Sequence, residues 1–438
     1  MAKILHLPPE IIDQLCTHIR PMTPTRILFA SDTSNPGAQM SWNALYSLSM
    51  TCRYLRAAIA DSGLLYRSIR MLRSPDRLIP LLKLIKNKPA VGAAIHQIWM
   101  VVDDDGNPPC VELCFSEAAM LRKMSRTYNI NVFNNLRDLG SNIYYRGSAG
   151  PLLSLLLAHT PRVRDIGFLI CSTFEGDRTS SDQRPELSHL KSLSLSSEYS
   201  LEDAGAKTLG VLLKSGFVEN LYLESMFIKT SKIMLPSWFK NTSSLTMDGI
   251  NLKPSKLRSI LGGCAPLHTF RYTRQKDDES LILDPPTLVS MLSESHGKTL
   301  RTLCINDRQE WLYNYRARVG SLKAFVNVES LWLDTTIIDG VDRLQRETVS
   351  EHRAVQRQVL EALPRSLKRM FLANGAFGRG PMKCVSVSSE LSETKKMVSG
   401  LGEVWWGEQF VAGRIGEEIA PEKDKAAYKA YLTASEWE

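Results

Sequence analysis

An aliphatic pattern recurs along most of this 438-residue chain. Its unit reads aliphatic-x-x-aliphatic-x-aliphatic, so the last two apolar positions alternate with exposed ones, as in a short β-strand with one buried face. A partial copy has only Leu245 and Met247. The full copies are Ile95-Ile98-Met100, Val163-Ile166-Phe168, Leu190-Leu193-Leu195, Val218-Leu221-Leu223, Leu267-Phe270-Tyr272, Leu300-Leu303-Ile305, Val328-Leu331-Leu333 and Leu367-Met370-Leu372.

Helical stretches, each closed by a short turn, lie between the predicted strands. They are Leu152–His159, Ala204–Ser215, Ser255–Leu261, Thr287–Ser293 and Val355–Leu363. The copies recur mostly every 24 to 33 residues or so, with two longer gaps, near the period of leucine-rich repeats. One strand and one helix cannot bury their apolar sides alone, but stacked copies can. We therefore expect a leucine-rich-repeat solenoid of parallel strands and helices over residues 74–380. The alternative is an ordinary parallel α/β fold, which would show no repeat consensus at this period.

Two features qualify this solenoid. Its unit lacks the Asn that ordinary leucine-rich repeats place after the strand, so the coils should be irregular. The last segment, residues 381–438, holds a strand-like run at Cys384–Val387 and the pair Trp405-Trp406. We interpret this segment as a C-terminal cap in which the two tryptophans cover the last coil, because exposed terminal repeats need a cover. The alternative role of the tryptophan pair is peptide binding.

The first segment, residues 1–73, has a different pattern, that of three helices. Apolar residues at helical spacing begin at Leu7, a second helix is expected over Trp42–Ala60, and a short third one carries Leu64, Leu65, Tyr66 and Ile69. Pro21 and Pro24 end the first helix. A loop rich in Thr, Ser, Pro and Gly joins the first two helices, over about residues 21–41.

The first segment resembles the F-box family. The residues that carry the resemblance are Leu7-Pro8-Pro9-Glu10-Ile11-Ile12, Leu45-Tyr46-Ser47-Leu48 and Thr51-Cys52-Arg53-Tyr54-Leu55. Two departures from the family pattern are the long loop and Leu55, which stands where many members have Trp. The whole chain is similar to divergent fungal proteins that join an F-box to leucine-rich repeats. The alternative is a three-helix cap on the repeat array.

Composition narrows the range of functions. The chain has 54 basic and 46 acidic residues and a net charge of +8, a modest excess without a dense Lys/Arg block. We expect no nucleic-acid partner. No apolar stretch approaches the roughly 20 residues that span a bilayer, and no signal peptide is evident, so we expect no membrane association. The scattered cysteines suit a reducing compartment, and an intracellular location in cytoplasm or nucleus is expected.

A search for catalytic chemistry finds no convincing motif. Gly297-Lys298-Thr299 resembles the end of a phosphate loop, but Leu292 stands where that loop requires Gly. Asp103-Asp104-Asp105-Gly106 lacks the first ligand of a calcium loop. The histidines show no metal-ligand pair at helical spacing. We therefore expect a protein that is not an enzyme, with no metal and no cofactor.

The resemblance implies a function. F-box proteins dock on a SKP-type adaptor, which hangs from a cullin, and they bring a protein substrate to an SCF-type ubiquitin ligase. The residues that match the family's adaptor contact are Leu7, Pro8, Glu10, Ile11, Leu48 and Leu55. The middle strand positions should face outward and bind the substrate. They include Ser194, Tyr222, Thr246, Arg271, Cys304, Trp332 and Phe371. Tyr222, Arg271 and Trp332 are the strongest candidates because aromatic and Arg residues dominate binding hot spots. The alternative is that flanking loops cover these positions. The alternative function is a repeat scaffold without a ubiquitin role. The pattern does not identify the substrate.

Overall fold

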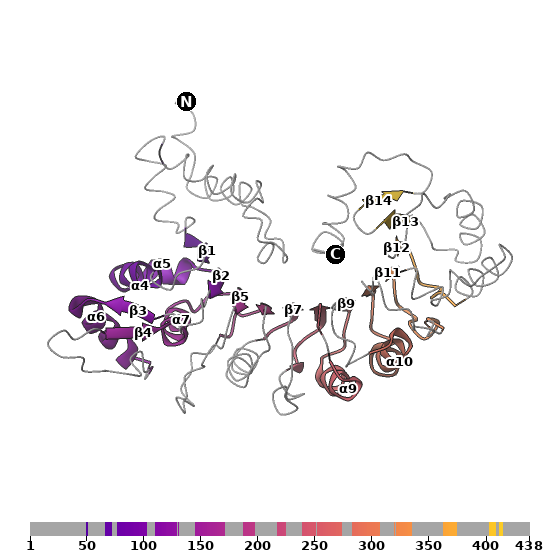
Figure 1. Ribbon diagram of the computed structural model, residues 1–438, viewed down its shortest axis with the longest axis horizontal. Helices are drawn as coiled ribbons and strands as arrows, with labels where there is room; N and C mark the ends of the chain where they lie inside the picture. Colours follow the sequence, from indigo (N-terminus) through magenta and orange to yellow (C-terminus); the bar gives the residue numbers. More distant parts are fainter. Residues whose placement is uncertain are drawn as a thin grey trace. The chain divides into compact units, whose positions relative to one another are not determined.

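The computed structural model divides the chain into unit 1, Met1–Val218, and unit 2, Glu219–Glu438 (Figure 1). Each unit is described by itself below. The residues that the structure describes are 50, 66–71, 77–102, 110–128, 130, 145–170, 187–197, 217–224, 239–250, 252–273, 283–306, 319, 321–334, 362–374, 403–408 and 411–414.

The described strands of unit 1 form a parallel sheet in chain order. They are β1 (Ser68–Met71), β2 (Gln97–Val102), β5 (Asp165–Ile170) and β6 (Ser192–Ser197). The register aligns the consensus positions, since Ile98 pairs with Ile166 and Ile166 with Leu193. The prediction of a short helix that includes Ile69 is wrong at this residue, because Ile69 lies in β1 and pairs with Ile98. A β-branched residue favours this paired conformation over a short isolated helix.

Helices and one hairpin accompany this sheet. They are α4 (Leu78–Asn87), α5 (Pro89–Ala94), α6 (Phe115–Arg126), α7 (Ala149–Ala158) and the antiparallel pair β3 (Cys110–Leu113) and β4 (Tyr145–Ser148). Helix α4 contacts both α6 and α7. The predicted helix Leu152–His159 is confirmed as α7. Pro89 starts α5, as expected of a residue with a fixed φ and no N–H.

Unit 2 repeats the parallel arrangement. Its strands, in sheet order, are β7 (Asn220–Glu224), β8 (Ser244–Asp248), β9 (Thr269–Thr273), β10 (Thr302–Asn306), β11 (Ser330–Asp334), β12 (Arg369–Asn374), β13 (Glu403–Glu408) and β14 (Val411–Arg414). Only the pairing of β13 with β14 is antiparallel among these described pairs. Trp405 and Trp406 lie in β13, which pairs with β12 and prolongs the sheet. Their predicted role as a cover of the last coil stays a prediction. The predicted strand Cys384–Val387 lies outside the described residues.

Two helices are described in unit 2. Helix α9 (Pro254–Gly263) joins β8 to β9, and α10 (Pro285–His296) joins β9 to β10. They contact one another and lie on the same side of the strands (Figure 1). Both confirm predicted helices, whereas Ala204–Ser215 and most of Val355–Leu363 fall outside the described residues. The described residues just before β11 form turns. The irregularity that the missing consensus Asn predicts stays a prediction, because much of the chain between the strands lies outside the described residues.

The consensus aliphatic residues form the core of each unit. Every one with a described side chain is buried, from Ile95 to Met370. In the partial copy, the buried Thr242 takes the first apolar position. Burying one such aliphatic side chain contributes about 1.5 to 3 kcal/mol, and the register stacks each one against its equivalents in neighbouring repeats. The pattern in the sequence is thus the pattern of the core.

A repeated backbone contact sets this register. In most of the described repeats, the carbonyl group of the residue before the strand accepts two N–H donors from the next repeat. The His268 carbonyl accepts from Arg301 N (2.8 Å) and Thr302 N (3.0 Å), and the Arg301 carbonyl accepts from Glu329 N (2.8 Å) and Ser330 N (3.0 Å). In unit 1 the Arg67, His96 and Arg164 carbonyls do the same. The residues before successive strands are thereby placed side by side.

His296 ties consecutive repeats together at the end of α10. Its ring is buried, with Nδ1 accepting from Leu267 N (3.4 Å) and Nε2 lying 2.9 Å from the Leu261 carbonyl oxygen. Because Nδ1 accepts, the ring proton lies on Nε2, which donates to that carbonyl. Burial lowers the pKa of His296, although the bond to Leu261 opposes the shift. The histidine is therefore a neutral structural bridge between α9, the strand turn and α10.

Gly92 marks a close approach of two segments in unit 1. A Cβ atom added to this residue would lie 2.3 Å from the carbonyl oxygen of His159 and 3.0 Å from Cγ2 of Ile85. The oxygen belongs to the backbone, so it cannot move aside cheaply. Gly262 in α9 is the opposite case, since nothing lies within 4 Å of its added Cβ. The same substitution to alanine can therefore be compared at a crowded and at an open glycine.

We predict opposite effects of alanine at these two positions. Gly92→Ala should lower the free energy of unfolding by about 1 to 3 kcal/mol, because the methyl group overlaps the His159 carbonyl. Gly262→Ala should raise it by about 0.5 to 1 kcal/mol, because alanine favours the helix. Urea denaturation of both variants beside the parent measures these changes. Equal effects of the two substitutions would contradict the packing around Gly92.

Candidate functional site

The predicted substrate residues come together in one row of unit 2. Register joins the middle positions of successive strands, so residues far apart in sequence become neighbours. This set, the central row, is Tyr222, Thr246, Arg271, Cys304, Trp332 and Phe371. The alignment predicted from the repeat unit is therefore confirmed for Tyr222, Arg271 and Trp332.

The predicted exposure of these three side chains is wrong. Tyr222 and Arg271 are each 7% exposed, and Trp332 is 0% exposed. Tyr222 donates its hydroxyl proton to Oδ2 of Asp248 over 3.3 Å, and all three residues interact with other groups of the chain. The alternation along a strand identifies the face on which a residue lies, but it carries no information on whether that face is open to solvent. Substrate binding by these residues stays a prediction.

The other residues predicted to face outward are also buried or half-buried where the structure describes them. Cys304 and Ser194 are buried, Thr246 is half-buried, and the side chain of Phe371 is outside the described part. Burial of Cys264 raises the pKa of its thiol to about 12, so that thiol stays protonated. Cys304 is thus packed into the repeats and Cys264 is half-buried, whereas Cys114 is exposed.

A second row lies just before the strands of unit 1. It consists of Arg67, His96, Arg164 and Lys191, and is called the basic row below. The paired carbonyl contacts place its members one strand apart, a spacing of about 4.8 Å. Arg67 Nε donates to His96 Nδ1 over 3.3 Å, so His96 is neutral in this contact. Arg164 and Lys191 are exposed.

An acidic residue stands next to the basic row but not in it. Asp165 is the first residue of β5, and its Oδ2 accepts from Nε2 of the buried Gln97 over 2.8 Å. This bond holds the carboxylate on the sheet. On the other side of the row, Arg162 is exposed two residues before Arg164. The described residues at the amino ends of the unit 1 strands are thus mainly basic.

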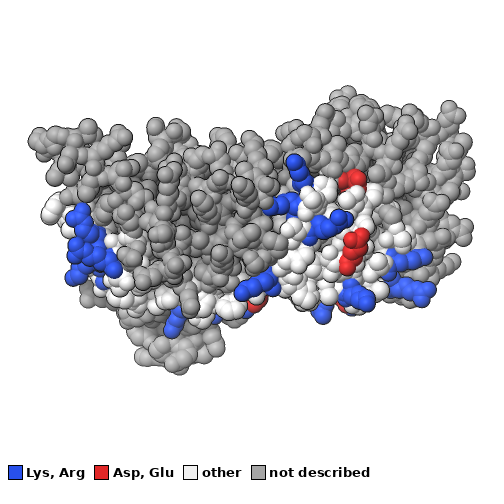
Figure 2. Space-filling model, turned by 90° about the horizontal axis from the view of Figure 1, so that it is seen from below, with Lys and Arg blue, Asp and Glu red and all other residues white. Residues whose placement is uncertain are grey.

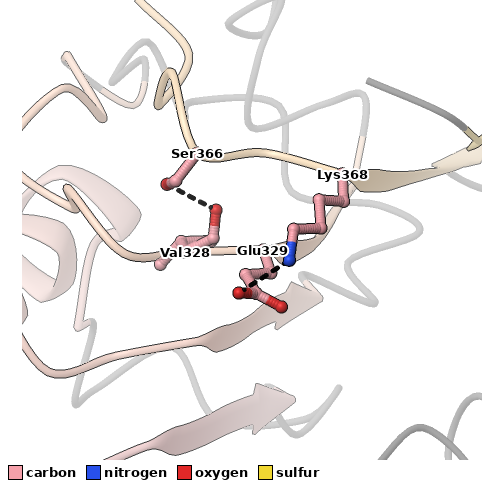
Figure 3. Close-up of polar contacts among 4 residues, drawn as sticks. All are labelled: Val328, Glu329, Ser366 and Lys368. Carbon is pink, nitrogen blue, oxygen red and sulfur yellow. Dashed lines mark hydrogen bonds and ion pairs between the residues drawn. The ribbon is translucent and has the colours of Figure 1, made fainter. Parts of the chain in front are cut away.

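The equivalent row of unit 2 has mixed charges. It consists of Glu219, Ser243, His268, Arg301, Glu329 and Lys368, and is called the mixed row. Lys368 Nζ lies 2.9 Å from Glu329 Oε1, and Ser366 beside them donates to the Val328 carbonyl over 2.8 Å (Figure 3). The side chains of this ion pair are 60% and 43% exposed, so it contributes little to stability. It does show that neighbouring side chains of such a row reach one another.

Like charges at this spacing repel. In water the repulsion of two unit charges 4 Å apart is of order 1 kcal/mol, and directly opposed like charges weaken a sheet. The row of unit 2 itself includes glutamates, whereas no member of the basic row is acidic. Lys and Arg are also more frequent than Asp and Glu among the coloured residues of the face in Figure 2.

The sequence search missed the basic row. It looked for a dense Lys/Arg block, whereas these residues are separated by long stretches of chain. Each one, however, directly precedes the first residue of a strand. Reading down that position of the repeat unit in the sequence would have found His96, Arg164 and Lys191.

Within the described residues, no group of three or more His, Cys, Asp or Glu could hold a metal ion. No described helix is long and apolar enough to cross a membrane. Gly297 follows the end of α10, whereas a phosphate loop would open a helix. Asp103–Asp105 and all the predicted adaptor residues, Leu7, Pro8, Glu10, Ile11, Leu48 and Leu55, lie outside the described residues.

Comparison with known proteins adds little. No family model matches this chain, and no curated protein matches it. A similar solved structure is that of the leucine-rich repeat-containing protein LegL7 from Legionella pneumophila, which is 13% identical over 76% of this chain and 91% of that chain, with a TM-score of 0.34. A likeness at this level carries no argument. The description of the fold as a mixed α/β array, consistent with leucine-rich repeats, rests on the strand order and register.

We predict that Trp332 is needed for stability. Trp332→Ala should lower the free energy of unfolding by about 3 to 5 kcal/mol, because a fully buried aromatic side chain is removed. Val326, which is 54% exposed in the preceding turn, is the control, and Val326→Ala should change it by less than about 0.5 kcal/mol. Chemical denaturation measures both. A Trp332→Ala protein as stable as the parent would mean that Trp332 is open to solvent after all.

Proposed function

We propose that this chain is a non-catalytic scaffold that binds another protein on its repeats. The observation that supports this best is the in-order parallel array, in which each repeat adds one strand and one set of side chains to continuous rows. Repeat arrays of this type offer extended binding surfaces without needing a pocket. The rows beside the strands, with their exposed charged residues, are the parts of the described surface best suited to contact a partner.

The more specific proposal is that the scaffold is the substrate receptor of an SCF-type ubiquitin ligase. Its support is the sequence resemblance of Leu7–Ile12 and of residues 45–55 to the F-box. In this proposal Leu7, Pro8, Ile11, Leu48 and Leu55 contribute apolar contacts to a SKP-type adaptor, and Glu10 lies among them. The adaptor connects to a cullin. The receptor then works by proximity, holding substrate lysines near the transfer enzyme. An intracellular location goes with this role.

The other candidate is a repeat scaffold without any ubiquitin role. In that case the F-box-like helices cap the first repeat. This alternative is supported by β1, at Ser68–Met71, because this part of the first segment joins the sheet of the repeats. The first segment would then bury its apolar residues against its own chain, and no adaptor would bind.

A pull-down separates these two functions. Tagged full-length protein should recover the SKP-type adaptor and cullin from a cell extract. Pro8→Ala/Ile11→Asp should reduce adaptor recovery at least tenfold, because a carboxylate in an apolar contact is costly to desolvate. Immunoblotting for adaptor and cullin measures recovery.

The control for this experiment is Lys323→Ala, a change at an exposed residue of unit 2 far along the chain. It should recover as much adaptor as the parent, and circular dichroism should show that all three proteins are folded. A folded parent that recovers no adaptor, or a Pro8→Ala/Ile11→Asp variant that recovers it fully, would leave the scaffold function and remove the ligase role.

A further inference from the structure

The basic row points to the chemistry of a partner. We propose that Arg67, Arg164 and Lys191, with His96 between them, bind an acidic segment of a partner protein. This inference rests on the proposed function as a protein-binding scaffold, and it does not require the ubiquitin role. It names the partner's chemistry, a run of Asp or Glu side chains, and the surface that receives it.

Two equivalent rows of the chain differ in charge. The same carbonyl contact builds the basic row in unit 1 and the mixed row in unit 2. In unit 2 the chain supplies its own acidic groups, and Glu329 meets Lys368 at 2.9 Å. In unit 1 no member of the row is acidic. Carboxylates from a second protein would find exposed cations along this row at Arg164 and Lys191.

The side chains of the basic row suit carboxylates. Arg67 and Arg164 have planar guanidinium groups that bind a carboxylate through two parallel N–H···O bonds. His96 accepts from Arg67 Nε, a bond that does not use the two terminal nitrogens of that guanidinium. Lys191 adds a third cation at the far end of the row, and the exposed Arg162 flanks Arg164.

The length of the basic row suits a short extended segment. Its four members span three inter-strand steps, or roughly 14 Å. An extended peptide advances about 3.3 Å per residue, so four or five residues cover this distance. A single-stranded nucleic acid would combine such cations with aromatic side chains on which its bases stack, and the row contains no aromatic residue other than the His96 ring. An acidic peptide is therefore the better match.

A direct binding measurement tests this proposal. The probe is a fluorescein-labelled decapeptide of alternating Glu and Ala, with a Gln-for-Glu peptide of the same length as a neutral control. Fluorescence anisotropy at low ionic strength gives the dissociation constant for the purified full chain. Arg164→Glu/Lys191→Glu should weaken binding at least tenfold, because two attractive charges become repulsive. The Gln peptide should bind at least tenfold more weakly to the parent than the Glu peptide does.

A charge-matched variant separates this site from the overall positive charge. Arg258→Glu/Lys323→Glu makes the same change in net charge on exposed residues of unit 2 that lie outside both rows. It should change the affinity by less than twofold. Thermal unfolding checks that both variants fold, and Arg164→Gln/Lys191→Gln replaces the first variant if it does not.

Three results would overturn the proposal. One is equal loss of affinity in the two charge-reversed variants, which would show attraction by net charge alone. Another is the absence of measurable binding of the Glu peptide to the parent. The third is tighter binding of a labelled ten-nucleotide oligo-dT that also depends on Arg164 and Lys191, which would make the site one for nucleic acid. Since no adaptor takes part, a failed pull-down would leave this result unaffected.

Discussion

The carbonyl group before most of the described strands, with its two N–H donors from the next repeat, is the contact on which the rest of this structure depends. It holds the strands parallel and in one register. Register in turn stacks the consensus aliphatic side chains, so that Leu303 lies beside both Phe270 and Leu331. A shift of a single residue would move every one of these side chains to the other face of the sheet. The core and the surface rows are therefore consequences of the same backbone geometry.

Register also explains how a repeat array can present a defined chemical surface. One position of the repeat unit becomes a row across the sheet, so the charge of that row is set by one residue per repeat. In unit 1 the position before the strand supplies Arg67, Arg164 and Lys191, and in unit 2 it supplies both signs. The central row shows the other possibility, in which the side chains are taken into the interior. Tyr222, Arg271 and Trp332 are buried there.

Much of the fold could be predicted from the sequence, because the repeated aliphatic triplets report the burial of one strand face directly. The strands around Leu193, Phe270 and Leu331 follow from this pattern, as do α7, α9 and α10. The secondary structure at Ile69 was harder to predict, because its place in a strand depends on pairing with Ile98, which is distant in sequence. The burial of Trp332 could not be predicted, because alternation identifies a face and not what covers it. The basic row required the register, which composition alone conceals.

The most direct test of this account is a chemical cross-link across the basic row. Arg164 and Lys191 are separated by a full repeat in sequence, but the register places them on neighbouring strand turns about 4.8 Å apart, within the Cα separation that a disulfide spans. In Arg164→Cys/Lys191→Cys, mild oxidation followed by digestion and mass spectrometry should find these two cysteines joined while the protein remains folded. Two free thiols at these positions in the folded, oxidised protein would contradict the register, and with it the rows on which the proposed binding function stands.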